Sequence, residues 1–256
     1  MVKVCALASS SSGNSVYVAT SRTRILIDAG LSRRETFQRI VNIGEDPEKL
    51  DAILLTHEHS DHVAGLLPIG RKLHIPIYAS RLTAQSIAWD NYSPNLETFQ
   101  AGTSFTVGDI EVQSFSIPHD AVDPVGFTLR SQGVKIGIAT DLGYLPDSIH
   151  FHLRGTHCLL LESNHDLDML KVGPYPWSVK QRVMSRRGHL SNDVVSQFIQ
   201  EHLDSSVATL MLGHLSEHNN HPEIVRLTAA QAIEGRRHAA NLVVLDPGKQ
   251  SEAFVY

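Results

Sequence analysis

The stretch Thr56-His57-Glu58-His59-Ser60-Asp61-His62 gathers three imidazoles and a carboxylate within six positions. Neutral imidazole nitrogen and carboxylate oxygen are ligands that suit zinc, iron and manganese. The alternate residues His57, His59 and Asp61 cannot share one helix face, but they can converge from a tight loop. The apolar run 50–55 before them predicts a short buried strand. The stretch therefore predicts a metal site at the carboxyl end of a strand, where α/β sheets usually bind their ligands.

The rest of the chain alternates strand-like and helix-like segments, as α/β folds do. The 256 residues include 42% hydrophobic ones, enough for a sizeable core. No linker-like boundary divides the chain, so we predict one domain spanning residues 1–256. Further predicted strands are 2–8, 15–20 and 24–28. Predicted helices are 32–43, one starting within 64–70, 191–203 and 222–237.

Composition narrows the setting of the protein. No signal peptide and no apolar stretch long enough to cross a bilayer is found, so we expect no membrane partner. Cys5 and Cys158 lie in apolar runs, which predicts buried free thiols and a cytoplasmic location. The net charge of −5 gives no general attraction to nucleic acid. Basic residues are nevertheless concentrated within 171–187, and they form either a solvated face or a basic lip beside the metal site.

The His-x-His-x-Asp-His pattern resembles the signature of the metallo-β-lactamase superfamily. This resemblance implies an α/β fold, a four-layer αβ/βα sandwich of two mixed sheets flanked by helices. It also requires another His, an Asp and a last His, each at the end of a strand. The sequence supplies His119, Asp141 and His214 in that order, each after a strand-like run.

The resemblance also implies a ligand set and a cofactor. It implies two divalent metal ions, Zn²⁺ or Mn²⁺/Fe²⁺, with a metal-bound hydroxide as nucleophile. The first ion would take His57, His59 and His119, the second Asp61, His62 and His214, and Asp141 would bridge them. Asp28 matches an early motif of the superfamily, where such a carboxylate supports a metal-binding His or orders the nearby loop. The alternative is that Asp28 is only a turn residue at a strand end.

Two further residues match the ribonuclease Z group of this superfamily. Glu162 ends a predicted strand and His189 precedes a predicted helix, in the positions of a pair thought to help proton transfer near the leaving group. A carboxylate-paired imidazole is a plausible general acid. The alternative is a salt-bridge residue and a helix-terminal residue. Members with a Cys ligand tend to hydrolyse β-lactams, but neither cysteine here lies near a ligand motif, and an oxygen-rich site suits phosphodiesters.

Four patches, 8–15, 162–166, 188–192 and 213–220, together resemble the bacterial YycJ/WalJ family, nearly end to end. That family implies a metal-dependent nuclease with 5′-to-3′ exonuclease action on DNA. The first patch is rich in hydroxyl groups, and such a loop either holds a phosphate beside the metals or forms a flexible hairpin turn. Its candidate phosphate-binding residues are Ser10, Ser11, Ser12 and Asn14.

The aromatic residues Tyr175 and Trp177 lie on a loop rich in proline, where they either stack on a base or pin the loop to the core. No long insertion that could clamp a substrate is present. A compact nuclease would therefore grip nucleic acid, expected to be DNA, with its core surface, a second copy in a homodimer or an accessory protein. His218 and His221, just after the last predicted ligand, either shape the pocket or are surface loop residues, and His165 is assigned no role.

Three hypotheses follow. The first is a dinuclear phosphodiesterase acting on nucleic acid, for which the catalytic residues would be Asp61, Glu162 and His189. The second is a metallohydrolase of a small phosphodiester, lactone or thioester, which the acidic net charge slightly favours. The third is a non-catalytic metal-binding protein, which would require a defective site, whereas no ligand position is missing.

Overall fold

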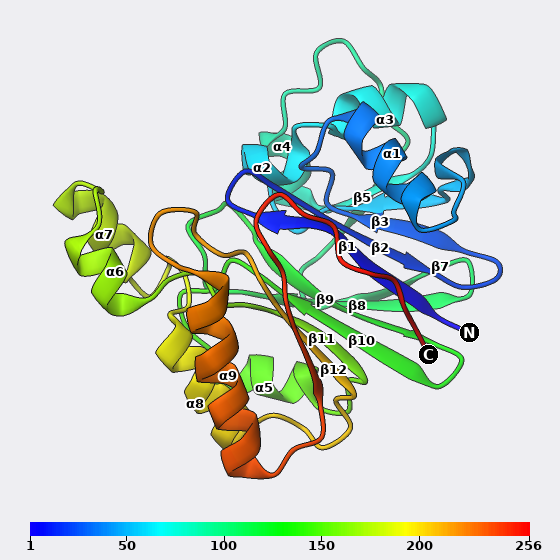
Figure 1. The fold of residues 1–256 in the computed structure, drawn as a ribbon. Coiled ribbons are helices and arrows are strands. Elements are labelled where there is room, and N and C mark those ends of the chain that lie inside the picture. Colours follow the sequence, from blue (N-terminus) through cyan, green and yellow to red (C-terminus); the bar gives the residue numbers. More distant parts are fainter.

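The computed structural model describes residues 1–256 and places their strands in two packed seven-stranded sheets (Figure 1). The first sheet has the order β14-β1-β2-β3-β4-β5-β6 and the second β13-β12-β11-β10-β9-β8-β7. The first contains β1 (Lys3–Ser10), β2 (Gly13–Ala19), β3 (Arg24–Ile27), β4 (Ala52–Leu54), β5 (Ile77–Ser80), β6 (Leu96–Phe99) and β14 (Phe254–Val255). The second contains β7 (Ser104–Val107), β8 (Ile110–Ser116), β9 (Val125–Ser131), β10 (Val134–Ala139), β11 (Cys158–Glu162), β12 (Thr209–Gly213) and β13 (Asn241–Val244).

Both sheets are mixed and follow the same plan. Strands β1 to β3 and β7 to β10 pair antiparallel, whereas β3 to β6 and β10 to β13 pair parallel. A core of 21 buried residues joins the inner faces of the two sheets, with Val4 and Val18 on one side and Phe127 and Met211 on the other. The predicted sandwich of two mixed sheets is confirmed.

Helices cover the outer face of each sheet (Figure 1). A core of 16 residues lies under the helices of the first sheet and one of 22 residues under those of the second. The first sheet carries α1 (Arg33–Asn42), the 3₁₀ turn Pro47–Lys49, α2 (Ser60–Val63), α3 (Leu66–Leu73) and α4 (Arg81–Ser86). The second half carries α5 (Asp147–Leu153), α6 (Leu167–Val172), α7 (Trp177–Val183), α8 (Asn192–Glu201) and α9 (Pro222–Arg236). Helices α6 and α7 project from the body of the molecule at one end.

Three helices lie where the sequence predicts them. Ser32 caps α1 by accepting a hydrogen bond from the Glu35 amide, and Ser191 caps α8 through the Val194 amide. Helix α9 begins with Pro222, whose fixed φ suits a first turn. Cys5 and Cys158 are buried free thiols, as predicted. No helix is long and apolar enough to span a membrane.

The helix after the histidine-rich stretch differs from the prediction. The sequence places its start within 64–70, but α2 already begins at Ser60, inside the stretch, so Asp61 and His62 project from a helix. Gly65 lies between α2 and α3. Only glycine fits there without a shift of the backbone, because an added Cβ would lie 1.9 Å from the Leu31 carbonyl oxygen. Gly30 likewise lets α2 approach, since its Cβ would lie 1.7 Å from the Asp61 carbonyl oxygen.

Candidate metal centre

Three histidines form one group at the strand-end edge of the sandwich. His57 and His59 follow β4, and His119 follows β8. Their ring nitrogens lie within 4.8 Å of one another. His57 is fully buried and its Nε2 atom has no hydrogen-bond partner, while His119 Nε2 lies 3.4 Å from His59 Nδ1. Three imidazole nitrogens therefore point at one small volume.

A second group lies beside the first. Asp61 and His62 come from α2, and His214 follows β12 in the other sheet; their ligand atoms also lie within 4.8 Å of one another. The Asp61 Oδ2 atom is 3.3 Å from His62 Nε2 and 3.6 Å from His214 Nε2. The backbone amide of His214 donates to the Ser9 hydroxyl at 2.8 Å, which joins the two sheets at this edge.

Asp141, at the end of β10, lies between the two groups. Its Oδ2 atom is 3.4 Å from His62 Nε2, and its Oδ1 atom is 3.5 Å from His214 Nε2 and 3.8 Å from His119 Nε2. The side chain is buried and its backbone has a φ of 63°. The two carboxylate oxygens thus face different histidines, as a bridging ligand requires.

The residues present fit a pair of divalent cations. His57 Nε2, Asp141 Oδ2 and His214 Nε2 are buried and lack hydrogen-bond partners, although buried polar atoms nearly always have one. Burial alone would lower the pKa of His62, but the carboxylates of Asp28 and Asp141 raise it well above its ordinary value. These unpartnered buried atoms can be satisfied by bound cations, and the imidazole and carboxylate donors suit zinc, manganese or iron.

Asp28 lies behind the second group. Its Oδ2 atom accepts hydrogen bonds from His62 Nδ1 and the Thr56 hydroxyl, both at 2.8 Å, and its Oδ1 atom accepts from the Thr56 amide at 2.8 Å. A proton held on Nδ1 leaves His62 Nε2 free to face the other ligands. Asp28 thus contacts both a metal-facing histidine and the adjoining loop, whereas a turn residue would need neither contact.

We expect Asp28→Asn to weaken metal binding by about 10- to 100-fold, because an amide cannot hold the His62 proton as a carboxylate does. A metal titration of chelator-treated protein would measure this. Asp51→Asn is the matched control, since the Asp51 carboxylate caps the backbone amide of Arg24 on the surface. Equal affinities in the two variants would leave Asp28 with a turn role alone.

Glu162 ends β11 and is fully buried. Its Oε1 atom accepts from His189 Nδ1 at 2.7 Å and from His214 Nδ1 at 2.8 Å. Its Oε2 atom accepts from the amides of Leu142 at 2.9 Å and Leu190 at 3.1 Å. Burial would raise the pKa of Glu162, but the two imidazoles lower it to about 2. The sequence pairs Glu162 with His189 only; the structure adds His214.

His189 reaches the site from the loop before α8. Its side chain is 16% exposed, and its ring lies 5.2 Å from that of His119 and 5.3 Å from that of His214. Burial lowers its pKa, but the Glu162 carboxylate outweighs this and raises the pKa above its ordinary value. With Nδ1 bonded to Glu162, the Nε2 atom remains to act on a bound molecule.

The serine-rich loop forms the turn between β1 and β2, which is one of the two alternatives that the sequence leaves open. Asn14 Oδ1 accepts from the Ser10 amide at 3.1 Å, and Asn14 Nδ2 donates to the Ser10 carbonyl at 2.9 Å and to Asp61 Oδ2 at 3.1 Å. The Ser10 and Ser12 hydroxyls are 2.8 Å apart. Ser10 and Asn14 are buried, so they build the turn and hold Asp61; only Ser11 lines the cavity.

A cavity of about 240 Å³ opens over the two groups. Besides ligand candidates it is lined by residues that the sequence analysis missed, among them Asp120, Asn164 and Ser216. The position of Asp120 directly after His119 was the available signal. One wall comes from α7 and the loop before it, with Tyr175, Val179, Arg182 and Val183.

Of the basic residues within 171–187, only Arg182 lines this cavity, where its Nε atom lies 3.5 Å from Asp120 Oδ2. Lys180 is buried and donates to the Lys171 carbonyl at 2.7 Å. Arg186 stacks on the Tyr144 ring at 4.2 Å, and Arg187 donates to the His119 carbonyl at 3.4 Å. The basic lip is therefore one arginine; Lys171, Arg186 and Arg187 are exposed, as on a solvated face, and Lys180 is buried.

Tyr175 and Trp177, the two aromatic residues of this region, differ in their position relative to the cavity. Tyr175 lines the cavity and meets the His218 ring edge-on at 5.9 Å. Trp177 is 63% exposed and lies outside the cavity. Only Tyr175 is therefore placed to contact a bound molecule, and Trp177 does not pin the loop to the core.

His165 is a buried histidine that faces no ligand group. It is 1% exposed, and its Nδ1 atom has no hydrogen-bond partner. Burial lowers its pKa from about 6.5 to about 4. Between these values the unfolded chain binds a proton that the folded chain rejects, so stability is lost as the pH falls through this window.

We expect this loss to reach about 3 kcal/mol below about pH 4, and His165→Gln to lose correspondingly less stability on acidification. Urea unfolding of both proteins at about pH 7 and about pH 5, with chelator present to exclude metal effects, would measure the difference. Equal losses in the two proteins would contradict this account of His165.

Two packed mixed sheets with a cluster of histidines and carboxylates at one edge define a metallo-β-lactamase fold. A family model described as a beta-lactamase superfamily domain matches residues 23–215. The chain belongs to this superfamily and, within it, to the WalJ/YycJ family.

The chain is 38% identical over 236 residues to exodeoxyribonuclease WalJ of Streptococcus pneumoniae, covering 90% of this chain and 88% of that protein. It is 36% identical over 233 residues to exodeoxyribonuclease YycJ of Bacillus anthracis, covering 89% and 88%. Among solved structures, the metallo-β-lactamase fold protein YhfI of Bacillus subtilis superposes with a TM-score of 0.73 at 18% identity, covering 98% of this chain and all of that one. The last similarity supports the fold alone.

Proposed function

We propose that this protein is a dinuclear metal-dependent phosphodiesterase that removes nucleotides from the 5′ end of DNA. The observation that carries the proposal is the similarity, over about nine-tenths of both chains, to two proteins named exodeoxyribonucleases. The residues that fit two cations, with Asp141 between them and no cysteine among the ligands, agree with phosphodiester chemistry. We further propose that residues 1–256 act as one hydrolase domain and that zinc, manganese or iron occupies the site.

The metal ligands in this proposal are those of the two groups and Asp141. His57, His59 and His119 would hold one ion, Asp61, His62 and His214 the other, and Asp141 both. Bound there, the ions would supply a water-derived nucleophile at neutral pH and stabilise charge on the phosphoryl oxygens. Asp28 and Glu162 orient His62 and His214, so that their Nε2 atoms face the ions.

The protein's own residues would do the remaining work. The Glu162 carboxylate keeps a proton on Nδ1 of His189 and raises the pKa of that imidazole. His189 would then give the proton on its Nε2 atom to the departing oxygen of the phosphodiester. Arg182, on the opposite wall beside Asp120, would bind a non-bridging phosphate oxygen.

The shape of the site favours attack at a strand end. A cavity of about 240 Å³ is smaller than most drug-sized ligand sites, which begin near 300 Å³. Tyr175 and Val179 close one side and the loop with Ser11 another. A terminal nucleotide would fit between these walls with its base against Tyr175. A small-molecule phosphodiesterase is the alternative, and no relative named above favours it.

Digestion of duplex DNA with a labelled 5′-phosphate tests the proposal, in separate zinc- and manganese-supplied reactions. We expect metal-dependent release of 5′-terminal nucleotides. Duplexes labelled at the 3′ end would reveal the opposite polarity. Turnover of a small chromogenic phosphodiester by well-metallated protein, without any digestion of DNA, would instead select the small-molecule alternative.

A further inference from the structure

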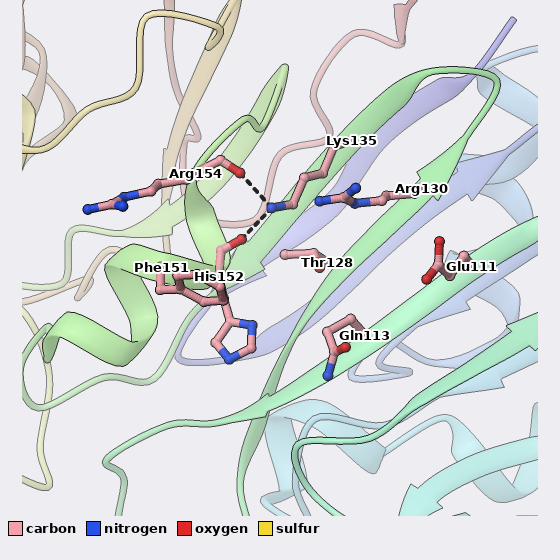
Figure 2. Close-up of a pocket in the computed structure, with 8 residues that line it drawn as sticks. All are labelled: Glu111, Gln113, Thr128, Arg130, Lys135, Phe151, His152 and Arg154. Carbon is pink, nitrogen blue, oxygen red and sulfur yellow. Dashed lines mark hydrogen bonds between the residues drawn. The ribbon is translucent and has the colours of Figure 1, made fainter.

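A second and larger cavity, of about 400 Å³, lies on the outer face of the second sheet beside α5 (Figure 2). Its walls come from β8, β9, β10 and α5. Lys135, near the start of β10, lines it, whereas Asp141 follows the end of that strand. Asp141 lies six residue steps beyond Lys135, so at the rise of a strand the cavity lies about 20 Å from the metal centre. It is a different site from the catalytic one.

Three cations line this cavity, Arg130, Lys135 and Arg154, and none of them forms an ion pair with a carboxylate. Arg130 is in register with Glu111 on the neighbouring strand, yet the two side chains form no ion pair. Figure 2 shows the Arg130 guanidinium directed toward the Lys135 amine instead. Burial lowers the pKa of Lys135, and the nearby charge of Arg130 lowers it further. A bound anion would relieve this repulsion.

The unused donors in the cavity can be counted. The Lys135 ammonium has three protons; two go to the carbonyls of His152 and Arg154, each at 2.6 Å, which leaves one. The Arg130 guanidinium makes no hydrogen bond within the protein, so all five of its donors remain. The hydroxyl of Thr128, a buried residue, also faces the cavity without an internal partner. A guanidinium, an ammonium and a hydroxyl form a donor set that suits phosphate oxygens.

The rim of the cavity carries features that suit the rest of a nucleotide. Phe151 is 68% exposed, although large apolar side chains are usually covered, and its ring can stack on a base. The Glu111 carboxylate on the opposite side can accept hydrogen bonds from sugar hydroxyls. A neighbouring cavity of about 520 Å³ is lined by Glu111, Arg130 and Lys135 as well, so the hollow continues along the strand ends.

We propose that this cavity binds the phosphate of a nucleotide, with Arg130 as its principal contact. The nucleotide is either part of the DNA strand being degraded or the free 5′-monophosphate that hydrolysis releases. This inference rests on the proposed function, because both sources are the substrate or product of a nuclease. Binding to the cavity and cleavage at the metal centre can nevertheless be measured separately.

The test compares metal-loaded wild type with Arg130→Gln and with the control Arg226→Gln, an exposed arginine of α9 that lines neither cavity. Calorimetric titration with deoxyadenosine 5′-monophosphate should reveal two binding events in wild type and in the control. In Arg130→Gln the affinity of one of these events should fall by about tenfold or more, because the variant loses a charge-assisted hydrogen bond to the phosphate. Thermal unfolding of each variant reports whether the fold is intact.

A second measurement separates the two sources. If the strand occupies the cavity, the KM for a long duplex rises in Arg130→Gln, while kcat and turnover of a small chromogenic phosphodiester stay unchanged. If the free nucleotide occupies it, only nucleotide binding is lost. Unchanged binding and unchanged KM would overturn the proposal. If Arg130→Gln loses one binding event but the wild type cleaves no DNA, the nucleotide site in the cavity is supported and only the proposed nuclease function is contradicted.

Discussion

We expect the Asp141→Ala variant to lose turnover and most of its bound metal. The Asp141 carboxylate faces His62 through one oxygen and His214 and His119 through the other, so it contacts histidines of both groups. Removing it would leave each ion without one ligand and leave the ions without a shared negative charge. Two cations held close together without that carboxylate would repel each other.

Digestion of DNA together with metal analysis of the purified variant would measure both losses. Because Asp141 has a positive φ, Ala also strains the backbone there. Asp141→Asn is therefore the second variant, since Asn keeps the shape and tolerates this conformation while removing the charge. Asp147→Ala, on the exposed first turn of α5, is the surface control. A rate within about twofold of wild type in both Asp141 variants would exclude the bridging role.

The positions of Asp141, Glu162 and His214 could be predicted from the sequence because each lies at or just after a strand end. Strands that are parallel and adjacent, such as β10, β11 and β12, bring their carboxyl ends to one edge. Asp141, Glu162 and His214 meet there for that reason. The family resemblance suggested the remaining ligands, and the structure places all seven proposed ligands in overlapping groups of three or four residues.

Other features depended on contacts that sequence patterns do not record. Helix α2 and the turn after it lie against the backbone of residues 29–31, a close approach that Gly30 and Gly65 permit and that sequence patterns do not record. The sequence predicts Ser10 and Asn14 as phosphate-binding residues because they are polar. In the structure both are buried and hydrogen-bond to each other within the turn. The cations of the 171–187 region differ because packing directs Lys180 inward and Arg182 outward to the cavity.

The backbone conformation at three strand ends could not be predicted from the sequence either. Asp28, Asp141 and His214 all have φ between 56° and 63°, a region that non-glycine residues rarely adopt. Such strain persists only where the surroundings enforce it, and it concentrates at functional sites. Each of the three turns a side chain toward the centre at the point where its strand stops. The strain therefore forms part of how the site is assembled.

We expect His189→Ala to slow the chemical step by about 10²- to 10⁴-fold, the usual contribution of a general acid, while its metal content stays at the wild-type level. His189 belongs to no ligand group in the proposal, and its Nδ1 atom is bonded to Glu162. Single-turnover digestion and metal analysis would measure the two quantities. Loss of metal in this variant would show that His189 is a ligand.

Glu162→Gln should differ from His189→Ala in a diagnostic way. One Glu162 oxygen accepts from both His189 and His214, and the other from two backbone amides, so an amide side chain must leave at least one of these donors without an acceptor. We therefore expect Glu162→Gln to lower metal affinity through His214 and the chemical rate through His189. In the double variant the rate loss should be smaller than the two single losses combined, because Glu162 acts on the rate through His189. Additive rate losses would instead mean that Glu162 and His189 act independently, and metal affinity unchanged by Glu162→Gln would show that His214 needs no carboxylate behind it.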